Sequence, residues 1–581
     1  MTEQSKGKTS GPLTWAGLSP RGSCLLAELP IVLAALALFW ALLSLAHYWS
    51  RPVNPQVQID LRPSALPVYA LFSLSRIAVA YVISLIFALA YGYIAAHHAG
   101  AERLMIPVLD TLQSIPVLCF LPGVMISMVA LFPDSQFGLE LGSILLIFTG
   151  QVWNMAFSVY SSLRSIPCEL AEAADVYGLS RWQRFIQLEL PQTAIGLIWN
   201  SMMAVAAAWF ALMVCEMFVL GDRDLRLPGL GSYLQSASNA GDTGAIVWGL
   251  FVMIAVIVLI DRLIWRPVIA WSEKFKFEQV ERASLSHSAV FDFLRGSKLF
   301  SNAQAFLARA AEAVTLFFAR RRVPPDMAKS RRDLHKWTSR GLFIMLSAGV
   351  MYAVVRMIAL MGAISPKEVE AILLGAGATF LRVELTLILA ALWTIPAGVS
   401  IGLNPKLAAI AQPLAQVAAS LPAPALFPIV LMILIRIGGG LGIASIVLLL
   451  LGTQWYILFN VIAGASAIPG ELEEVCQVFH LSRIQRWRKL LLPAIFPYLI
   501  TGFVTASGGA WNASIIAEYF RFRGHTFSIT GVGAVISRAT DAGNFPVLLG
   551  ATIAISAMVV TINRLLWRPL YNLASKKFSL S

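Results

Sequence analysis

Long apolar stretches, separated by short polar segments, make up most of the sequence. Residues 31–46, 245–260 and 443–451 with its flanks approach or reach the ~20 apolar residues that a helix needs to span a bilayer. A transmembrane β-barrel would instead show short segments of alternating hydrophobicity. We therefore predict an all-α polytopic membrane protein with about 12 transmembrane helices, near residues 30–48, 70–97, 107–131, 141–162, 193–219, 244–264, 341–363, 376–403, 413–436, 441–463, 495–518 and 545–565.

The second half of the chain repeats the first half. Trp153 matches Trp455 and Pro167 matches Pro469 at an offset of 302 residues, whereas Pro116 lies 306 residues before its counterpart. Self-similarity on this scale indicates an internal duplication. Because each copy has an even number of predicted helices, both copies enter the bilayer from the same side. We expect two tandem parallel six-helix repeats, with a pathway between them.

The repeats divide the chain into five parts. A tail, a first six-helix domain, a linker, a second six-helix domain and a second tail are predicted at residues 1–29, 30–265, 266–340, 341–568 and 569–581. In the linker, apolar residues from Ala303 to Phe318 recur at steps of three and four, which predicts an amphipathic helix on the membrane surface. Clustered Lys and Arg residues further along the linker indicate that the linker and both termini are cytoplasmic.

The composition agrees with this class of protein. The chain is 58% hydrophobic and 13% charged, against about 25% charged residues in soluble domains. The net charge of +13 follows from basic cytoplasmic loops and does not indicate nucleic-acid binding. The five cysteines are scattered and form no CxxC pair, so they indicate neither a disulfide framework nor a metal site.

Each copy also contains one polar, helix-forming segment between apolar stretches. Residues 169–191 read ELAEAADVYGLSRWQRFIQLELP, and residues 471–493 read ELEEVCQVFHLSRIQRWRKLLLP. Early glutamates favour a helix start, Gly178 suits a left-handed helix end, and Ser180 with Gln183 has the spacing of a capping box. Each segment is therefore predicted to form a helix, a tight turn and a second helix. An ordinary polar loop is the alternative, but two copies in matched register favour a docking surface for two copies of a partner.

The first segment resembles the EAA motif of importer-type ABC transporter permeases. Residues 172–174 read Glu-Ala-Ala, and Gly178, Leu188 and the pair Leu190-Pro191 follow at the motif's spacing. The second copy departs from the motif, because residues 474–476 read Glu-Val-Cys and His480 replaces the glycine. A residue other than glycine at a left-handed helix end costs up to ~1 kcal/mol. We therefore expect the second hairpin to turn differently or to bind its partner less symmetrically.

The residues around both segments are similar to those of the nitrate, sulfonate, taurine and bicarbonate branch of these permeases. They include Cys215-Glu216-Met217 followed by Gly229-Leu230-Gly231, and the corresponding residues of the second copy. The resemblance implies a type I ABC importer (MetI-like) permease fold, with two permease domains fused in one chain. It also implies that each hairpin sits in a groove of an ATP-binding subunit, and that a periplasmic or lipid-anchored binding protein delivers the solute.

The chain lacks the GxxxxGK[ST] phosphate loop. We therefore expect it to bind no cofactor and to catalyse no covalent reaction, with ATP and Mg in two separate ABC ATPase subunits. The residues expected to couple to those subunits are Glu169, Glu172, Ala173, Ala174, Gly178, Arg181, Glu471, Glu474, His480 and Arg483.

Ionisable and polar residues at membrane depth are candidates for the pathway. The predicted set is Trp209, Phe210, Glu216, Trp511, Asn512, Ser514, Glu518, Arg76 and Arg382. Asn512 and Ser514 are the expected substrate contacts, and their counterparts Phe210 and Leu212 would make the facing wall apolar. For Glu216 and Glu518 two interpretations remain: structural hydrogen-bond acceptors, or an outer-gate ion pair. For the tryptophans, packing in the core is the alternative.

These observations predict the permease of an ATP-driven importer for a small anionic solute. It would lie in the bacterial inner membrane, with both termini in the cytoplasm. The alternative is a secondary transporter with parallel repeats, driven by an ion gradient. That mechanism needs ionisable groups near the membrane midplane, for which Arg356 and Glu384 are the candidates.

Overall fold

The computed structural model describes residues 58–272 and 354–577 with short gaps, together with single positions between them. The gaps are 134, 221–222, 420, 437, 439, 469 and 523–524. Several predictions lie outside the described residues: the tail at 1–29, the helix near 30–48, the amphipathic linker helix and the last residues of the C-terminal tail. Of the helix predicted near 341–363, the structure describes mainly residues 354–362.

The first copy is almost entirely helical. A single 3₁₀ turn, η1 (Pro63–Ala65), precedes its first described span. Its elements in chain order are α2 (Leu66–His97), α3 (Ala99–Ser114), η2 (Val117–Phe120), α4 (Leu121–Leu131), α5 (Gln136–Arg164), α6 (Cys168–Val176), α7 (Arg181–Arg184), η3 (Phe185–Glu189), α8 (Leu190–Glu216), β1 (Val219–Leu220), β2 (Arg223–Asp224), α9 (Leu230–Ala240), α10 (Thr243–Ile260), η4 (Asp261–Trp265) and α11 (Arg266–Ser272).

The second copy repeats this order of elements. They are α15 (Pro366–Gly402), α16 (Pro405–Ala419), α17 (Ala423–Arg436), α18 (Gly440–Ser466), α19 (Gly470–Val478), α20 (Arg483–Arg486), η6 (Trp487–Leu491), α21 (Leu492–Ala517), β3 (Tyr519–Phe522), β4 (His525–Ser528), α22 (Val532–Asp541), α23 (Phe545–Ile562), η7 (Asn563–Trp567) and α24 (Arg568–Lys577). The correspondence agrees with the duplication inferred from the sequence.

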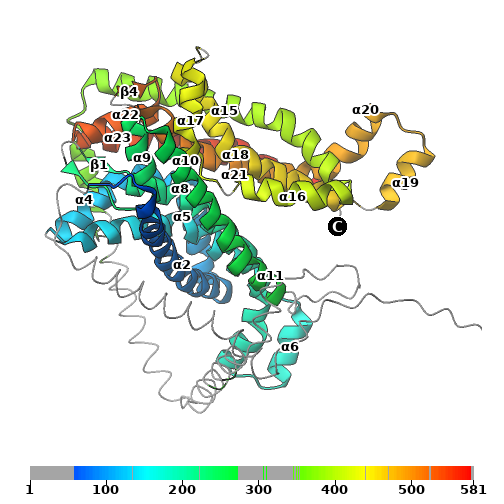
Figure 1. Cartoon of the computed structure of the whole chain (residues 1–581). Helices are drawn as coiled ribbons and strands as arrows, with labels where there is room; N and C mark the ends of the chain where they lie inside the picture. Colours follow the sequence, from blue (N-terminus) through cyan, green and yellow to red (C-terminus); the bar gives the residue numbers. More distant parts are fainter. Residues whose placement is uncertain are drawn as a thin grey trace, which may run out of the picture.

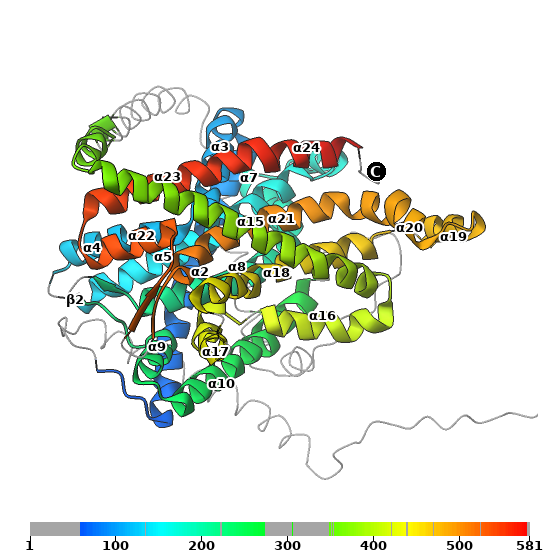
Figure 2. The same ribbon diagram turned by 90° about the horizontal axis from the view of Figure 1, so that it is seen from above.

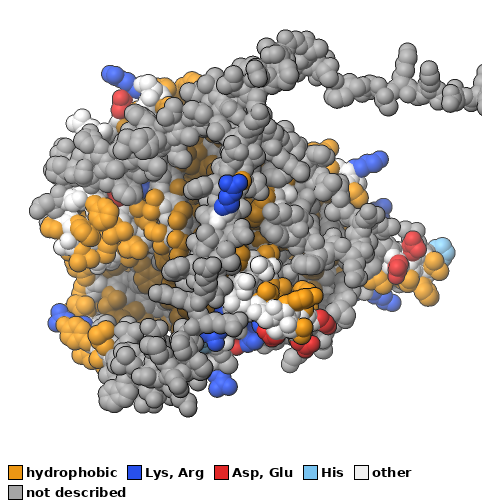
Figure 3. Space-filling view, turned by 90° about the horizontal axis from the view of Figure 1, so that it is seen from below, with side chains coloured by type: hydrophobic (Ala, Val, Ile, Leu, Met, Phe, Trp, Pro, Cys, Tyr) orange, Lys and Arg blue, Asp and Glu red, His pale blue; other side chains and the backbone are white. Residues whose placement is uncertain are grey.

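Eight helices in the described part of the chain are long and apolar enough to cross a membrane. Four belong to each copy, and two shorter apolar helices, Val117–Leu131 and Ala423–Leu434, add to them. Large apolar side chains point outward from the spans, for example Ile86 and Leu381, which are 64% and 69% exposed. The space-filling view shows apolar side chains gathered over the described surface (Figure 3). The prediction of an all-α polytopic membrane protein is confirmed.

The predicted spans at 107–131 and 413–436 are not continuous helices. In the first copy α3 ends at Ser114, and Ile115 adopts an extended conformation (φ −83°, ψ 130°) before Pro116. Proline disfavours a helical conformation of the residue before it, which explains the break. The second copy is interrupted at the corresponding place, where α16 ends at Ala419 and α17 begins after Pro422.

The second, fourth and fifth spans pack side by side in each copy, as α2, α5 and α8 and as α15, α18 and α21 (Figures 1 and 2). The two copies also exchange short segments. Leu118 and Cys119 of η2 join the core of the second copy, and Ala425 of α17 joins the core of the first. This reciprocal packing holds the copies together near the middle of the molecule.

The fifth span continues from the second helix of the polar hairpin without a break. The spans were predicted near 193–219 and 495–518, but residues 181–216 form one helical run through the π-turn η3, and residues 483–517 do the same through η6. Pro191 has no N–H to donate to the preceding turn, and a π-turn is one way for a helix to accommodate such a disruption. The second helix of each hairpin and the fifth span therefore form one continuous helical run.

The hairpins project from one side of the molecule and the short β-ribbons lie at another. Helix α6 and helices α19 and α20 extend away from the region where β1, β4, α9 and α22 gather (Figure 1). The ribbons are two-stranded and antiparallel, and in the second copy Tyr519 pairs with Ser528 and Phe522 with His525. We call these two regions the hairpin end and the ribbon end.

The close approach of the second and fourth spans depends on glycine. A Cβ atom added to Gly92 would lie 2.6 Å from Cγ1 of Val159, and one added to Gly398 would lie 2.7 Å from Cγ1 of Val461. Gly92→Ala should therefore destabilise the protein by ~1–3 kcal/mol, the usual cost of overpacking. The measurement is thermal unfolding of the purified chain. Gly100→Ala is the control, because Gly100 is helical with open space around its Cα, and that variant should be at least as stable as the parent. Equal stability of the two variants would contradict this packing.

Candidate functional site

A cavity of about 740 Å³ lies between the two copies. It is lined by the fifth spans α8 and α21, by the fourth spans α5 and α18, and by the ends of α10 and α23. Pockets of 300–1,000 Å³ are the usual size for binding a small molecule. The cavity is therefore the candidate pathway, at the place where parallel repeats predict it.

The two fifth spans present different walls to the cavity. The α8 wall is apolar and bulky, and comprises Trp199, Met202, Met203, Ala206, Ala207 and Phe210. The α21 wall is small and polar, and comprises Val504, Thr505, Ser507, Gly508, Gly509 and Asn512. Phe210 and Asn512 occupy equivalent positions and both line the cavity. The contrast that we expected between these two positions is present.

The interrupted third spans also reach the cavity. Gln113, Val117 and Leu118 line it from the first copy, and Leu421, Pro422 and Ala423 line it from the second. Non-helical backbone at membrane depth is tolerated where it is buried in protein or lines a water-filled cavity. The breaks that the sequence analysis did not predict are therefore part of the candidate site.

The cavity extends toward the hairpin end. Asp261 and Asn563, the first residues of the equivalent π-turns η4 and η7, line it on the hairpin side. On the ribbon side, Phe210 and Val214 of α8 pack with Ile516 of α21 among the buried clusters.

A second cavity, of about 410 Å³, is lined in part by Val214 and Ile516. Both copies line it, and its polar residues include Arg226 and Gln235 from the first copy and Arg521 and Asp541 from the second. Nε2 of Gln235 donates to the carbonyl oxygen of Arg521 at 3.1 Å, and Arg521 pairs with Asp541 at 2.7 Å. The copies therefore touch each other at the ribbon end.

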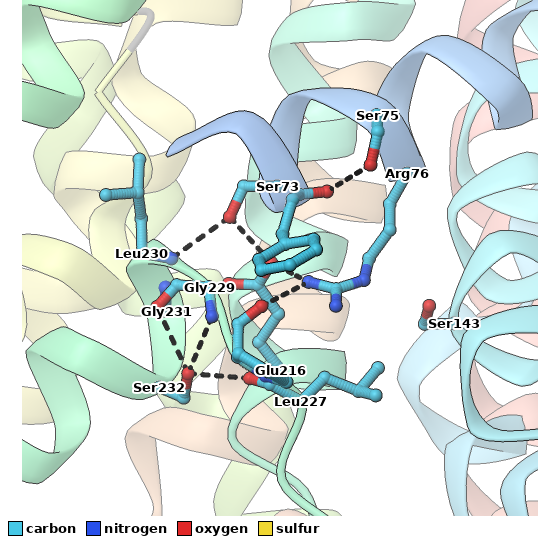
Figure 4. Close-up of polar contacts among 12 residues, drawn as sticks. Ser73, Ser75, Arg76, Ser143, Glu216, Leu227, Gly229, Leu230, Gly231 and Ser232 are labelled. Carbon is cyan, nitrogen blue, oxygen red and sulfur yellow. Dashed lines mark hydrogen bonds and ion pairs between the residues drawn. The ribbon is translucent and has the colours of Figure 1, made fainter. Parts of the chain in front are cut away.

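Arg76 is the centre of a buried polar cluster in the first copy (Figure 4). Its guanidinium pairs with Glu140 at 2.6 Å and with Glu216 at 2.7 Å, and Nη1 also donates to the carbonyl oxygen of Pro228 at 2.9 Å. Glu216 further accepts hydrogen bonds from Oγ of Ser73 at 2.7 Å and from the backbone N–H of Gly231 at 2.7 Å. All three charged groups are fully buried, so the cluster fastens the loop after α8 to α2.

The second copy has a reduced version of this cluster. Arg382 pairs with Glu518, which also accepts from Oγ1 of Thr379 and from the backbone N–H of Gly533 at 2.8 Å. The position equivalent to Glu140 is Gly442, so Arg382 faces one carboxylate where Arg76 faces two. The side chain of Arg382 is 13% exposed, against 1% for Arg76.

These ion pairs lie within one copy and do not cross between the copies. Neither Arg76, Arg382, Glu216 nor Glu518 lines either described cavity. Each of the two glutamates accepts hydrogen bonds from backbone and from an arginine of its own copy, which is the geometry that the structural interpretation describes. Glu140 did not emerge from the sequence analysis, although a lone carboxylate at the start of an apolar stretch was a usable signal.

The remaining pathway candidates divide between the wall and the core. Trp209 is 2% exposed, yet part of it reaches the cavity beside Phe210. Trp511 and Ser514 are fully buried and do not line the cavity, and the Ser514 hydroxyl donates to the carbonyl oxygen of Trp511 at 2.8 Å. Asn512 and Ser514 are two residues apart, so they lie on nearly opposite faces of the helix. Of the two expected substrate contacts, Asn512 alone is placed to touch a solute.

The polar hairpins fold as predicted, and both turn in the same way. Gly178 has a φ of +64° and His480 a φ of +48°, so a histidine occupies the left-handed position in the second copy. The expectation that the second hairpin turns differently is wrong. The capping boxes are present in both, with Ser180 paired to Gln183 and Ser482 paired to Gln485. The same local hydrogen bonds thus give both hairpins one shape, although His480 replaces the glycine in the second hairpin.

The hairpins carry exposed acidic and apolar side chains. The predicted coupling residues that are exposed are Glu169, Glu172, Gly178, Arg181, Glu471, Glu474, His480 and Arg483, whereas Ala173 is half-buried and Ala174 is buried. Just before each turn, Val176 and Tyr177 are 84% and 83% exposed, and Val478 and Phe479 are 74% and 73% exposed. Acidic and apolar side chains stand together on the projecting second hairpin at the right of Figure 3. Exposed apolar patches with a polar surround are typical of interaction sites.

A chain of polar contacts ties the first hairpin to α2. Arg184 pairs with Asp175 of α6 and with Glu189 of η3, both at 3.2 Å, and Glu189 lies 2.9 Å from Nε2 of His97. At the corresponding positions of the second copy, His97 and Glu189 are replaced by Leu403 and Leu491, which join an apolar cluster. The hairpins therefore attach to their bundles by different chemistry.

A second polar cluster occupies the hairpin end of the first copy alone. Glu102 of α3 accepts hydrogen bonds from Arg164 and, at 2.6 Å, from the Tyr160 hydroxyl. These bonds hold the pKa of Glu102 below its ordinary value. The equivalent residues in the second copy are Ala408, Ser466 and Ile462, which form no such cluster.

The fold and the site define a duplicated membrane transport protein, with a cavity between its halves and two exposed hairpins. Residues 84–264 and residues 394–571 each match the family described as "Binding-protein-dependent transport system inner membrane component". The two matches cover more than half of the chain. The chain therefore belongs to this family and contains its domain twice, as the sequence analysis predicted.

Several curated permeases are similar to part of the chain. A nitrate import permease protein from Leptolyngbya laminosa is 29% identical over 192 residues, a bicarbonate transport system permease protein from Synechococcus elongatus is 30% identical over 187, and a taurine transport system permease protein from Escherichia coli is 29% identical over 188. The matches cover 33%, 32% and 32% of this chain, and 64% of each relative. The chain thus spans less than two thirds of the length of the curated relatives that it matches.

The left-handed histidine gives a direct test of hairpin geometry. His480→Gly should stabilise the second hairpin by up to ~1 kcal/mol, because glycine adopts a positive φ without steric cost. Local opening exposes a hairpin to protease, so cleavage within residues 470–486 should slow by about fivefold for that free energy. Gly178→Ala is the matched change in the first hairpin and should speed cleavage there. Unchanged cleavage in both variants would argue against left-handed turns.

The two ion-pair clusters should differ in their contribution to stability. Arg76→Met leaves two buried carboxylates without a cation, and breaking a buried pair in this way costs about 3–5 kcal/mol. Arg382→Met leaves one buried carboxylate without a cation instead of two, so its cost should be smaller. Thermal unfolding of the two purified variants measures the difference. Equal losses of stability in the two variants would show that the buried carboxylate of Glu140 does not need Arg76 to balance its charge.

Proposed function

We propose that this chain is the transmembrane permease of an ATP-driven ABC importer for a small anionic solute. The observation that carries the proposal is the unbroken helical run from each exposed hairpin to the cavity wall. Residues 181–216 and 483–517 each begin at a hairpin and contribute side chains to the cavity wall. A partner that moves the hairpins would thereby move the two walls.

The partners in this proposal are two ABC ATPase subunits, one at each hairpin. Supporting features are the matched exposed pairs, Val176 with Tyr177 and Val478 with Phe479, each beside exposed glutamates. Aromatic side chains commonly anchor protein interfaces in a partner's pocket. ATP and Mg would be bound by those subunits, and the permease itself would transport without covalent chemistry. A periplasmic or lipid-anchored substrate-binding protein would dock at the ribbon end.

The anionic character of the solute is supported by two observations. The helical segments that begin at η2 and at α17 start at the cavity wall, and the N-terminal ends of helices carry partial positive charge. The relatives give the second observation, since the charged side chain of the described lining, Asp261, is itself a carboxylate and pairs with Arg266 at 3.2 Å. The relatives named for nitrate, bicarbonate and taurine transport agree with this assignment.

The proposed location is the bacterial inner membrane, with the hairpins and both termini in the cytoplasm. In that orientation the larger cavity extends toward the cytoplasm. Alternating access would require the walls to part at the ribbon end and to close at the hairpin end.

A secondary transporter is the weaker candidate. It would need a titratable group on the path near the membrane midplane, yet neither candidate, Glu384 or Arg356, lines either described cavity. The carboxylate that does line the larger cavity, Asp261, lies on its hairpin side and pairs with Arg266. Arg356 is exposed, and Glu384 lies half-buried on α15. An importer driven by ATP needs no such group, and it also explains why the hairpins are exposed.

The docking proposal predicts the effect of removing one exposed aromatic side chain from each hairpin. Tyr177→Ala combined with Phe479→Ala should lower ATP-dependent uptake at least tenfold, because interface anchors are worth 2 kcal/mol or more each. The measurement is uptake into proteoliposomes, together with the amount of ATPase subunit that co-purifies. Val247→Ala is the control, since Val247 is 61% exposed on a spanning helix, and it should change neither quantity. Normal uptake in the double variant would refute docking at these residues.

A further inference from the structure

We propose that His97 and Glu189 are positioning residues that hold the first hairpin against α2 through a shared proton, so that this hairpin and α2 move as one body. We call the contact between these two side chains the clamp. The inference rests on the proposed coupling of the hairpins to ATPase subunits, and it specifies how the first hairpin passes its motion to the bundle. It follows from the hydrogen-bond geometry of one histidine, which a leucine replaces in the second copy.

The contacts of His97 require one proton more than a neutral imidazole beside an ionised carboxylate contains. Nδ1 lies 3.0 Å from the carbonyl oxygen of Tyr93, and Nε2 lies 2.9 Å from Oε1 of Glu189. A carbonyl oxygen and an ionised carboxylate can only accept hydrogen bonds, and a neutral imidazole has a single N–H. Either His97 carries a proton on both nitrogens, or Glu189 carries the second proton. Both forms of the clamp hold the same additional proton.

The contacts of Glu189 place this proton on His97. Nε of Arg184 donates to the same Oε1 at 3.2 Å, and a cationic donor forms its stronger hydrogen bond with an ionised carboxylate. Oε2 of Glu189 is buried, and no residue in the described part of the chain donates to it. The buried carboxylate therefore depends on two cationic donors, and loss of the His97 proton removes one of them.

The surroundings of the pair leave His97 as its contact with solvent. The side chain of His97 is 30% exposed, against 3% for Glu189, so protons reach the pair through the imidazole. The elements packed around the pair carry further titratable or charged groups, which are Tyr93 on α2, Asp175 on α6, Arg181 and Arg184 on α7, Glu102 and Arg103 on α3, and Tyr160 and Arg164 on α5. Arg184 also pairs with Asp175, and Glu102 is held by Arg164.

The clamp joins α2 to the fifth span at the hairpin end. Glu189 directly precedes α8, and at the ribbon end Arg76 ties α2 to Glu216 at the end of α8. Helices α2 and α8 are therefore joined by charged contacts toward both ends. In the second copy the ion pair at the ribbon end is kept, whereas Leu403 and Leu491 occupy the positions of the clamp. A force on the first hairpin thus acts on α2 and α8 together.

The additional proton fixes the direction of the pH dependence. The clamped form holds this proton and the opened form releases it, so the clamp is strongest at acidic pH and weakens as the pH rises. Histidine is the side chain whose ordinary change of charge falls between about pH 5 and about pH 8. The clamp should therefore respond to pH in the range that cells experience.

The test measures hydrogen–deuterium exchange of the purified chain in nanodiscs between about pH 6 and about pH 8. Peptides from residues 168–189 report the first hairpin. Peptides from residues 470–491 are the internal reference, because the second hairpin lacks the clamp and the intrinsic exchange rate changes with pH alike in both. Protection of the first hairpin relative to the second should fall by roughly tenfold over this range, the value of one charge-assisted hydrogen bond.

Variants separate the shared proton from a contact that is only structural. His97→Gln keeps an N–H donor for Glu189 without a titratable ring, so protection should be retained and should no longer depend on pH. His97→Leu combined with Glu189→Leu reproduces the residues of the second copy and should also remove the pH dependence. His98→Gln is the matched control, because His98 is the neighbouring exposed histidine and lies outside the clamp. That variant should keep the parental pH dependence.

A second measurement follows the motion in the complex with its ATPase subunits. Spin labels at positions 94 and 172 report the distance from α2 to the first hairpin, and labels at 400 and 474 report the equivalent distance in the second copy. All four positions are exposed. On trapping with nucleotide at about pH 6, the first distance should stay constant, because hairpin and α2 move together. The second distance should change.

The outcomes separate the clamp from the transport proposal. Relative protection that falls with pH in the parent and in His98→Gln, and stays constant in His97→Gln, supports the clamp. Protection that is independent of pH in the parent, or that still depends on pH in His97→Gln, overturns it and leaves an ATP-driven importer intact. Equal responses of the two spin-label distances to nucleotide overturn the joint movement. A pH-dependent clamp in a chain that binds no ATPase subunit supports the shared proton and contradicts the importer.

Discussion

The buried ion pairs at the ribbon end are the constraint on which the rest of the structure depends. Arg76 with Glu140 and Glu216, and Arg382 with Glu518, fasten the far end of each fifth span to the second span of the same copy. Charges buried in this way are costly unless fully paired and hydrogen-bonded, so each cluster has few alternative arrangements. With that end fixed within its own copy, the span can be displaced from its other end, where it is continuous with the hairpin. An importer that a partner drives from outside the membrane requires a rigid helix bundle with an exposed hairpin.

The duplication gives the two halves the same fold, whereas residues that differ between the copies make the two halves chemically different. Both hairpins adopt one shape, although His480 occupies a position that glycine fills in the other copy. By contrast, the cavity walls differ at positions 210 and 512, and polar contacts such as that of His97 with Glu189 are replaced by leucines in the second copy. In a dimer of identical subunits, both halves would carry the same residue at each of these positions. Fusion of the two domains in one chain allows each half to be changed alone.

Much of this architecture was predictable, because its signals are local or repeated. The capping pairs of Ser180 with Gln183 and of Ser482 with Gln485 lie within four residues of each other, and the duplication placed both hairpins in register. Features that depend on tertiary contacts were not predictable. Glu140 meets Arg76 across 64 positions of sequence, and its counterpart in the other copy is a glycine. The sequence around the break at Ile115 is one continuous apolar stretch, and a proline within such a stretch is compatible with a span. The break therefore could not be predicted. Ser514 was assigned to the pathway by its polarity, whereas helix geometry turns it away from Asn512.

The central claim is that motion of the hairpins moves the cavity walls through the continuous fifth spans. It is tested most directly by spin-label distances in the complex, with one pair of labels at positions 177 and 479 on the hairpins and another at 203 and 505 on the walls. Both distances should shorten together when the ATPase subunits are trapped with nucleotide. A change between the hairpins with no change between the walls would contradict the account.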